Sequence, residues 1–413
     1  MKIFAGIFLL FVISVFSLYS QNDSILNRNS ALKLFISDDA CDLEFLKHEI
    51  TFVNYVRDRT EAQVYILASN QNTGSGGTNH LLFFIGQKEF VGKNDTISYS
   101  TRIDATADEI RNKNIQMIKI GLIPYVAKTP MIDNISISYD ATESKEEVKD
   151  KWNSWVFQFD ASSYLNGEKS YSYFSGNSGL SASRITEKSK IEISTGYYYN
   201  KNKYDTGDEI IESVSKSAWG SLLIVKSLTN HWSAGISLDC NNSTYSNIDF
   251  SYNIYPAIEY NIFPYSESSR KQIRIKYNIG FESNNYTDTT IYLKTKENLL
   301  GESLGIAFKT IQKWGSISMS VSGENYLHDF SKNSLYTSST ISLKIVKGLS
   351  FNLSGSYYFI HNQISLRKEG ASVEEILLSQ RQLATSYSYY CSVGLQYTFG
   401  SIFNNVVNPR FGN

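Results

Sequence analysis

The feature that most constrains this chain is a long alternation of apolar and polar residues that begins near Trp152 and continues to Phe399. In one stretch, Ile273, Ile275 and Tyr277 alternate with glutamine, arginine and lysine. Successive side chains of a β-strand point to opposite faces, so this pattern predicts strands with one apolar and one polar face. Comparable alternation occurs at 232–239, 316–322 and 387–399.

The spacing of these runs predicts an antiparallel transmembrane barrel at 152–399 with about twelve strands, since each strand and its connection takes roughly 20 residues. A soluble sandwich also alternates, but three features favour the barrel. Aromatic residues cluster near strand ends, as interfacial girdles do. The alternate face is mainly Ser, Gly and Asn, and short connections alternate with long ones. The clusters are at 155–157, 197–199 and 387–390, the short connections at 227–230, 314–315 and 347–348, and the long ones at 201–209, 284–290 and 361–385.

The N-terminus has the features of an export signal. Lys2 precedes an apolar run from Ile3 to Leu18, and Ser20 supplies a small residue at a cleavage point. A membrane anchor is the alternative, but the run is short for a bilayer span. We therefore expect a signal peptide at 1–20 and a location in the outer membrane of a Gram-negative bacterium. The short connections then all fall on the periplasmic side, as does the region before the barrel.

Residues 25–140 are predicted to form a small periplasmic α+β domain. Strand-like segments and turn signals alternate with two helical stretches, 42–50 and one that opens at Thr106. Thr106 and Glu109 can cap each other's backbone N–H groups, and Pro124 should kink or end the second helix. The expected strands are 31–37, 62–69, 79–86 and 95–101, and the apolar helix face is Ile115, Ile118, Leu122 and Tyr125. A charged linker follows at 141–151.

Two resemblances add to this organisation. The order β-α-β-β-β-α resembles the amino-terminal domain type of the periplasmic protein TolB, at the level of topology. Four segments resemble an uncharacterised outer-membrane barrel family of Bacteroidetes-type bacteria: Phe52–Arg59, Trp219–Ile236, Tyr255–Ser268 and Gly400–Gly412. The resemblance implies a periplasmic domain followed by a barrel and implies no activity. A tail at 400–413 would lie in the periplasm or in the barrel mouth.

The charge balance limits the functions that can be considered. Lys plus Arg (39) and Asp plus Glu (40) leave a formal charge of −1, which argues against a nucleic-acid partner and against strong ion selectivity. Charged and polar positions predicted to face the lumen could filter solutes or pair with each other and plug a narrow barrel. These candidates are Gln158, Asp160, Glu192, Glu259, Arg274, Lys276, Glu282, Glu324 and Lys344.

Catalytic and cofactor motifs are weak. His328, Asp329 and Ser331, with His361 across the next hairpin, could form a hydrolytic group at the outer rim. Serine is too abundant here for one nearby serine to be informative, so we expect no enzyme. The glycine-rich segment 72–77 lacks the Gly-Lys-[Ser/Thr] ending of a phosphate loop and is predicted to be a hairpin turn. No cofactor or metal site is expected, and the three cysteines have no metal-ligand spacing.

The sequence leaves three functions open. The first is an anchor or assembly scaffold, in which the barrel contacts outer-membrane lipid and residues 25–140 bind a periplasmic protein partner. The second is a porin-like passive channel for small polar solutes, and the third is an outer-membrane hydrolase with a rim active site.

The long connection at 361–385 contains a capping box at Ser372-Val-Glu-Glu375. A short helix there would lie over the pore mouth, inside the lumen or on the barrel rim.

Overall fold

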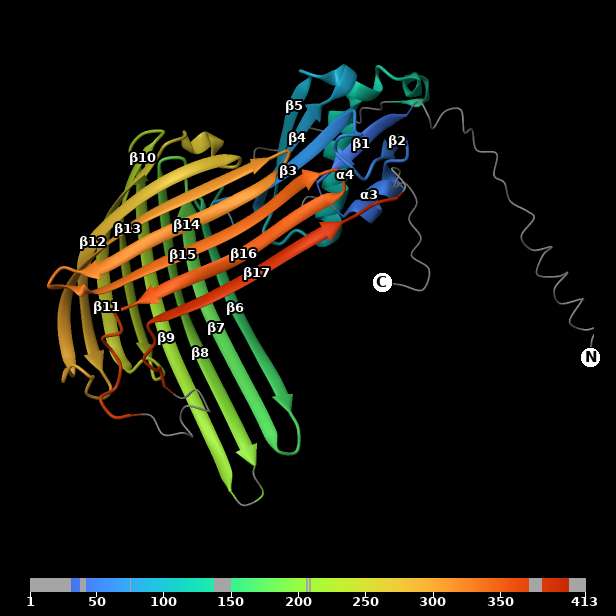
Figure 1. Cartoon of the computed structure of the whole chain (residues 1–413). Coiled ribbons are helices and arrows are strands. Elements are labelled where there is room, and N and C mark those ends of the chain that lie inside the picture. The colour runs from blue at the N-terminus through green and yellow to red at the C-terminus, as the bar shows by residue number, and fades with distance from the viewer. Residues whose placement is uncertain are drawn as a thin grey trace, which may run out of the picture.

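The structure is a computed structural model that describes residues 31–37, 42–74, 76–136, 150–205, 207, 209–370 and 381–400. Figure 1 shows a small α/β domain placed against one end of a large curled sheet. The domain contains a five-stranded sheet, and the large sheet has 12 strands. Among the described residues, no helix is long and apolar enough to cross a membrane. The predicted signal peptide, most of the linker, the helix near Ser372 and the tail after Gly400 lie outside the described residues.

The domain sheet has the strand order β2-β1-β3-β4-β5. Strand β1 pairs in parallel with β2 and β3, whereas β3, β4 and β5 form antiparallel pairs. The hairpin predicted at 72–77 joins β3 to β4. The elements are β1 (Leu32–Ile36), α3 (Leu43–Glu49), β2 (Val53–Tyr55), β3 (Val64–Asn72), β4 (Thr78–Gly86), η1 (Lys88–Phe90), β5 (Asn94–Thr101), α4 (Ala107–Val126) and η2 (Pro130–Asn134).

The capping box predicted for α4 is confirmed. The Thr106 hydroxyl accepts from the Glu109 N–H, and the Glu109 carboxylate accepts from the Thr106 N–H. Pro124 does not end the helix, which continues to Val126. A proline in the last turn removes one backbone hydrogen bond, and the burial of Tyr125 and Val126 against the sheet holds that turn in place.

Both faces of the domain sheet are apolar, because successive residues of its central strands enter different clusters. One cluster lies between the sheet and the helices and includes Leu34, Ile66 and Phe84. The other lies on the far face and includes Phe35 and Tyr65. A sheet with apolar residues on both faces needs a cover on each side. The helices cover one face, and the far face is turned to the large sheet.

The fold class predicted from the sequence is confirmed: a small α/β region precedes a 12-stranded antiparallel sheet. Each strand pairs with its neighbours in the chain, so the order runs from β6 to β17 without crossovers. The strands are β6 (Trp155–Gly167), β7 (Tyr171–Ile185), β8 (Ser189–Asp205), β9 (Ile210–Ser227), β10 (Trp232–Ser243), β11 (Ile248–Asn261), β12 (Lys271–Tyr286), β13 (Lys296–Gln312), β14 (Gly315–Tyr326), β15 (Asp329–Val346), β16 (Leu349–Ile360) and β17 (Tyr387–Tyr397), with η3 (Tyr265–Glu267) before β12.

One long connection is shorter than its sequence indicates. Residues 201–209 were expected to form a loop, but β8 continues to Asp205 and β9 begins at Ile210. The added ladder is polar, and Lys201 Nζ lies 2.9 Å from a Glu212 carboxylate oxygen across it. Backbone pairing and charge pairing therefore extend this hairpin beyond its apolar band, and in Figure 1 it projects past its neighbours.

Candidate functional site

The 12-stranded sheet has one polar face, which we call the serine-rich face. Cross-strand register identifies it, because residues opposite each other in neighbouring strands point to the same side. One row from β6 to β12 consists of Gln158, Ser181, Ser194, Ser221, Asp239, Asn253 and Glu282. Between β14 and β16 this face carries Ser320, Ser338 and Ser356 opposite one another.

All the residues predicted to face the lumen lie on the serine-rich face, as the same register and the alternation along each strand require. They do not form one group but are spread along the sheet. Gln158 and Asp160 lie on β6, Glu192 on β8, Glu259 on β11, Arg274, Lys276 and Glu282 on β12, Glu324 on β14, and Lys344 on β15.

Several of these charges are paired on the serine-rich face. Glu259 lies opposite Lys276 in register, and one of its carboxylate oxygens is 3.8 Å from Arg274 Nη1. The Tyr265 hydroxyl donates to the same carboxylate at 3.0 Å. On β8, Lys190 Nζ lies 3.0 Å from Glu192. Opposite charges are thus matched along this face.

The other face of the large sheet, the apolar face, leaves large side chains exposed. Phe159 is 69% exposed, Leu300 54% and Val393 63%. Water would penalise such a surface by about 25 cal/mol per Å² of apolar area. Monomeric soluble proteins rarely expose apolar patches of more than a few hundred Å². A hydrocarbon solvent removes the penalty.

A cavity of about 310 Å³ is hollowed into the half of the serine-rich face farther from the domain. Its lining comes mainly from β10 to β14 and includes Asp239, Tyr255, Glu282 and Tyr326, with Lys332 of β15 and Asn362 after β16 added to it. Because side chains from these strands line one cavity, the serine-rich face is concave there. The cavity is polar and contains hydroxyl, amide and carboxylate groups, which suit small polar solutes or water.

The connection after β16 closes over the end of the large sheet that holds this cavity. Ile364 and Leu366 are 6% and 8% exposed. The carbonyl of Ser365 accepts from Asn247 Nδ2 at 2.8 Å, and Asn247 belongs to the β10–β11 connection. An isolated bridge joins Arg367 to Thr290 in the β12–β13 connection. The described part of the loop therefore spans from β16 to connections several strands away.

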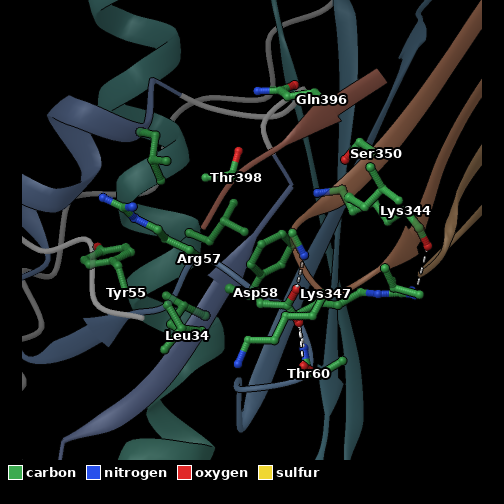
Figure 2. Close-up of a pocket in the computed structure, with 18 of the residues that line it drawn as sticks. Leu34, Tyr55, Arg57, Asp58, Thr60, Lys344, Lys347, Ser350, Gln396 and Thr398 are labelled. Atoms are coloured by element: carbon green, nitrogen blue, oxygen red, sulfur yellow. Dashed lines mark hydrogen bonds between the residues drawn. The ribbon is translucent and has the colours of Figure 1, made fainter. Parts of the chain in front are cut away.

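At the other end, the domain and the large sheet enclose a second cavity of about 530 Å³ (Figure 2), which we call the mouth cavity. The loop between β2 and β3 supplies Arg57, Asp58 and Thr60 on one side. Lys344 and Lys347 come from β15 and the turn after it, and Lys347 lies beside Asp58 and Thr60. Ser350, Gln396 and Thr398 complete the wall from β16 and the end of β17.

The β2–β3 loop is attached to the β15–β16 turn by charged hydrogen bonds, which we call the latch. Asp58 accepts from the Gly348 N–H at 3.0 Å, and Lys347 donates to Glu61. Burial raises the pKa of Asp58, but hydrogen bonds from Thr60 and Gly348 outweigh it and hold that pKa below its ordinary value. The hydrogen bond and charge of Lys347 lower the pKa of Glu61. Ionised Glu61 therefore favours the docked position through Lys347, whereas ionised Asp58 is stabilised first by Thr60 of its own loop and then by Gly348 across the contact.

Apolar and cation–π contacts support the latch. Ile311 of β13 packs against the far-face cluster of the domain. Lys344 Nζ lies 4.6 Å from the centre of the Phe35 ring, and the Arg270 guanidinium lies 4.9 Å from that of Phe83. The large sheet thus covers part of the domain face that the helices leave bare.

The docked domain reaches several other points of the rim. Ser69 Oγ donates to the Ser269 carbonyl at 3.1 Å, and Gln71 Nε2 donates to Ser268 Oγ at 3.4 Å. Gly74, in the β3–β4 hairpin, lies so close to β7 that an added Cβ would stand 2.6 Å from the Ile185 carbonyl oxygen. A side chain at Gly74 would force the hairpin away from the rim.

The hydrolytic group considered from the sequence is not assembled as a nucleophile and base. Ser331 Oγ donates to Asp329 Oδ1 at 2.6 Å, and the Ser331 N–H donates to the same oxygen. The His328 ring packs 5.9 Å from that of Tyr326, and the His361 ring packs 4.2 Å from that of Phe359. The serine therefore bonds to the neighbouring aspartate at the start of β15. No group of three or more potential metal ligands occurs in the part of the chain that the structure describes.

Sequence reasoning missed the docking contacts of the domain. The latch joins residues about 290 positions apart in the chain (Gly348 and Asp58), so no local pattern can reveal it. One signal was present: Val64–Leu67 is a run of four apolar residues without alternation. Such a run indicates a strand covered on both faces, and the domain's own helices cover only one.

Comparisons with known proteins add little. No protein-family model matches the chain, and no curated protein matches it. Among solved structures it is similar to one described as "NanC porin structure in rhombohedral crystal form". That likeness covers 58% of this chain and 99% of the other at 8% identity, with a TM-score of 0.29. A TM-score this low carries no argument about fold or function. The resemblances to the Bacteroidetes-type family and to the TolB domain gain no support.

Proposed function

We propose that the chain is an integral outer-membrane β-barrel protein that acts as an anchor or assembly scaffold, with its α/β domain on the periplasmic side. The exposed apolar face of the large sheet supports the membrane location, because lipid is the solvent that suits it. The strand lengths suit a membrane span, since about ten residues cross the hydrocarbon. The proposed periplasmic partner binds through residues 25–140.

The observation that carries the scaffold role is the docking of the domain. A domain that merely trailed from a pore would need no apolar far face and no charged attachment to the rim. Here Phe35 and Phe83 meet cations of the large sheet, and Asp58 and Glu61 hold the β15–β16 turn. This arrangement holds α4, on the opposite face of the domain sheet from the docked one, in a fixed orientation, as a partner-binding surface requires.

A porin-like passive channel is the second candidate, and one observation favours it. Most side chains on the serine-rich face are small and polar, and cavities of about 310 and 530 Å³ lie at the two ends of this face. In this proposal the charged and polar residues on that face, from Gln158 to Lys344, line the solute path. Paired charges such as Glu259 and Arg274 would give little ion selectivity. We propose no catalytic role for the rim histidines.

Planar-bilayer recording and partner capture on the same purified protein separate the two functions. The scaffold predicts a silent barrel and a periplasmic protein that cross-links to the domain in cells. The channel predicts stable conductance steps. A matched variant sharpens the result: Ile311→Asp should displace the domain, whereas Ser322→Asp places the same charge on the serine-rich face away from it. Steps in the wild type that persist in Ile311→Asp would contradict the scaffold proposal.

A further inference from the structure

The charges that line the mouth cavity are not balanced. The described residues of its lining include five cationic side chains and one carboxylate, that of Asp58. The chain as a whole has a formal charge of −1, so this excess of positive charge is local. The cations are Lys47, Arg57, Arg59, Lys344 and Lys347.

The carboxylates at the mouth cavity are already bonded within the latch. Asp58 accepts from the Gly348 N–H and from the Thr60 hydroxyl. Glu61, just beyond the lining, accepts from Lys347. The latch therefore uses its acids on its own donors and leaves the other cations of the cavity without a counter-charge from this loop.

Three of these cations, Arg57, Arg59 and Lys344, form no ion pair with a carboxylate of the described residues. Arg59 donates to the Lys344 carbonyl at 3.5 Å, and the Lys344 ammonium lies over the Phe35 ring. Neither of these partners carries a negative charge. The positive charge of the three side chains is therefore not cancelled locally.

Further cations lie beside Arg59. Burial lowers the pKa of Lys313, in the β13–β14 turn, and the charges of Arg270 and Arg59 lower it further. Like charges that repel one another in this way attract an anion placed between or beside them. The rim next to the mouth cavity therefore adds to the attraction for a negative ligand.

One wall of the mouth cavity presents a row of hydrogen-bond donors. Lys344, Ser350 and Gln396 lie opposite one another on β15, β16 and β17 (Figure 2). Their Cβ atoms are about 5 Å apart from strand to strand, so an ammonium, a hydroxyl and an amide can donate to one ligand. Within the described residues, no hydrogen bond engages the Ser350 hydroxyl or the Gln396 amide. Arg57 adds a guanidinium from the domain side.

The lining indicates the chemical class of the ligand. A guanidinium fork matches the oxygens of phosphate and carboxylate groups. The cavity of about 530 Å³ falls in the range of about 300 to 1,000 Å³ for small-molecule sites, and a single bare oxyanion would fill little of it. The lining also includes apolar side chains such as Leu43, Val346 and Leu349, which suit a carbon skeleton.

The position of the donor row favours a soluble ligand over a lipid. Lys344, Ser350 and Gln396 share the serine-rich face, because residues opposite each other in register point to the same side. In the proposed membrane location this face points away from the hydrocarbon. A ligand would therefore reach the row from the aqueous side.

We propose that the mouth cavity binds a soluble small organic molecule that carries two or more phosphate or carboxylate groups. Arg57 of the domain and the row of Lys344, Ser350 and Gln396 hold its anionic groups. The site goes beyond the proposed scaffold role and does not depend on it, since the cavity is present whether or not a partner binds. The rival occupants are an acidic peptide of a protein partner and an anionic lipid headgroup.

Isothermal titration calorimetry on the full chain in non-ionic detergent tests the proposal. The probes are fructose 1,6-bisphosphate and citrate, one for each type of anionic group, and fructose is the uncharged comparison. We expect at least one anion to bind with a dissociation constant below about 1 mM, and fructose to give no binding. Added salt should weaken the binding, because it screens exposed charges. No binding of either anion would overturn the proposal.

Two variants with matched controls locate the site. Arg57→Gln removes a cation that has no part in the latch, and Gln396→Glu places a negative charge in the donor row. Each should weaken binding by about tenfold. Arg102→Gln, after β5 at the opposite edge of the domain sheet, and Gln116→Glu, on α4, make the same changes elsewhere and should leave it unchanged. Equal affinities in all four variants would assign the binding to the surface at large and overturn the site.

Two further measurements separate the rivals. Hexaglutamate that binds at least about tenfold more tightly than both small anions would overturn the proposal in favour of an acidic peptide. Binding of phosphatidylglycerol alone would overturn it in favour of a lipid headgroup. Ile311→Asp, which should displace the domain, is expected to abolish anion binding, and unchanged affinity would contradict a site built from both parts. Heat-modifiable gel migration checks that each variant retains its folded sheet.

Discussion

The domain and the large sheet are both built on β-strands but bury their apolar side chains differently. In the domain, Leu34 and Phe84 are fully buried and Phe35 is 6% exposed. In the large sheet, Phe159 and Leu300 remain more than half exposed. Alternation therefore identifies strands, whereas exposure identifies the solvent that each face meets. The domain is built for water, and in the proposed membrane location the apolar face of the large sheet meets hydrocarbon.

The domain also shows how the two regions are joined. Its sheet has two apolar faces, and only one of them is covered by its own helices. Ile311 and the cations of Arg270 and Lys344 meet the second face. Burial of the domain's apolar side chains thus extends onto the rim of the large sheet at these contacts, whereas the apolar face of that sheet remains exposed. The following predictions test that contrast.

The largest effect is expected in the domain core. Phe84→Ala removes a fully buried ring and should destabilise the domain by about 3 to 5 kcal/mol. Hydrogen exchange of residues 82–126 in the detergent-solubilised protein measures it. Leu300→Ala, on the exposed apolar face, should leave that exchange unchanged. Equal protection in Phe84→Ala and the wild type would contradict burial as the source of domain stability.

The next effect concerns the apolar face of the membrane sheet. Ile306→Arg, near the middle of β13 and 47% exposed, should cost about 2 to 4 kcal/mol if lipid surrounds it. Ser322→Arg, opposite Gly305 on the serine-rich face, should cost much less. Denaturant unfolding in lipid vesicles, followed by gel migration, gives both values. If water surrounded Ile306, the Ile306→Arg change would be nearly neutral. That result would contradict the difference in solvent between the domain and the apolar face of the large sheet.

A smaller effect is expected at the start of α4. Thr106→Ala removes the hydroxyl that accepts from Glu109 and should cost about 1 kcal/mol. Exchange rates in the first turn of α4 should rise, with those of β15 unaffected. Thr106→Ser keeps an acceptor oxygen and should behave like the wild type. A loss shared by the alanine and serine variants would assign the effect to packing of the methyl group.

The smallest effect is expected from acid on the latch. The folded-state pKa values of Asp58 and Glu61 are lowered, so their contribution is complete above their unfolded pKa values near 4. It is lost as pH falls through the lower folded values. Protection of residues 57–61 from exchange, relative to the intrinsic rate at each pH, should therefore fall below about pH 4, and Asp58→Asn should remove most of that dependence. A loss of protection of the same size at pH 8 would contradict this prediction.

The sequence allowed the large sheet and the helix cap to be predicted because both depend on local order. Alternation yields the strands, and the Thr106–Glu109 spacing yields the cap. Strand β2 was missed because Val53–Tyr55 is too short to show a period. The residues predicted to face the lumen share one face of the sheet because alternate residues of a strand point to the same side. The contacts between these residues, such as Glu259 with Arg274, depend on how far each side chain extends, which the alternation does not show.

The docking of the domain was beyond sequence reasoning for a different reason. Ile311 lies in an ordinary strand, and nothing nearby in the sequence marks it as a contact for the far-face cluster of the domain. The contact exists because the chain returns to the same rim after many strands. Only the apolar far face of the domain, which its own helices leave uncovered, indicates that another part of the protein packs there.

The most direct test of the central claim is the state of the protein in its own membrane. Outer membranes from a Gram-negative host are extracted with carbonate and then with detergent, and the extract is run on a gel with and without boiling. The claim predicts release by detergent only and faster migration of the unboiled sample, since the folded barrel stays compact. Release by carbonate, with identical migration of boiled and unboiled samples, would contradict it.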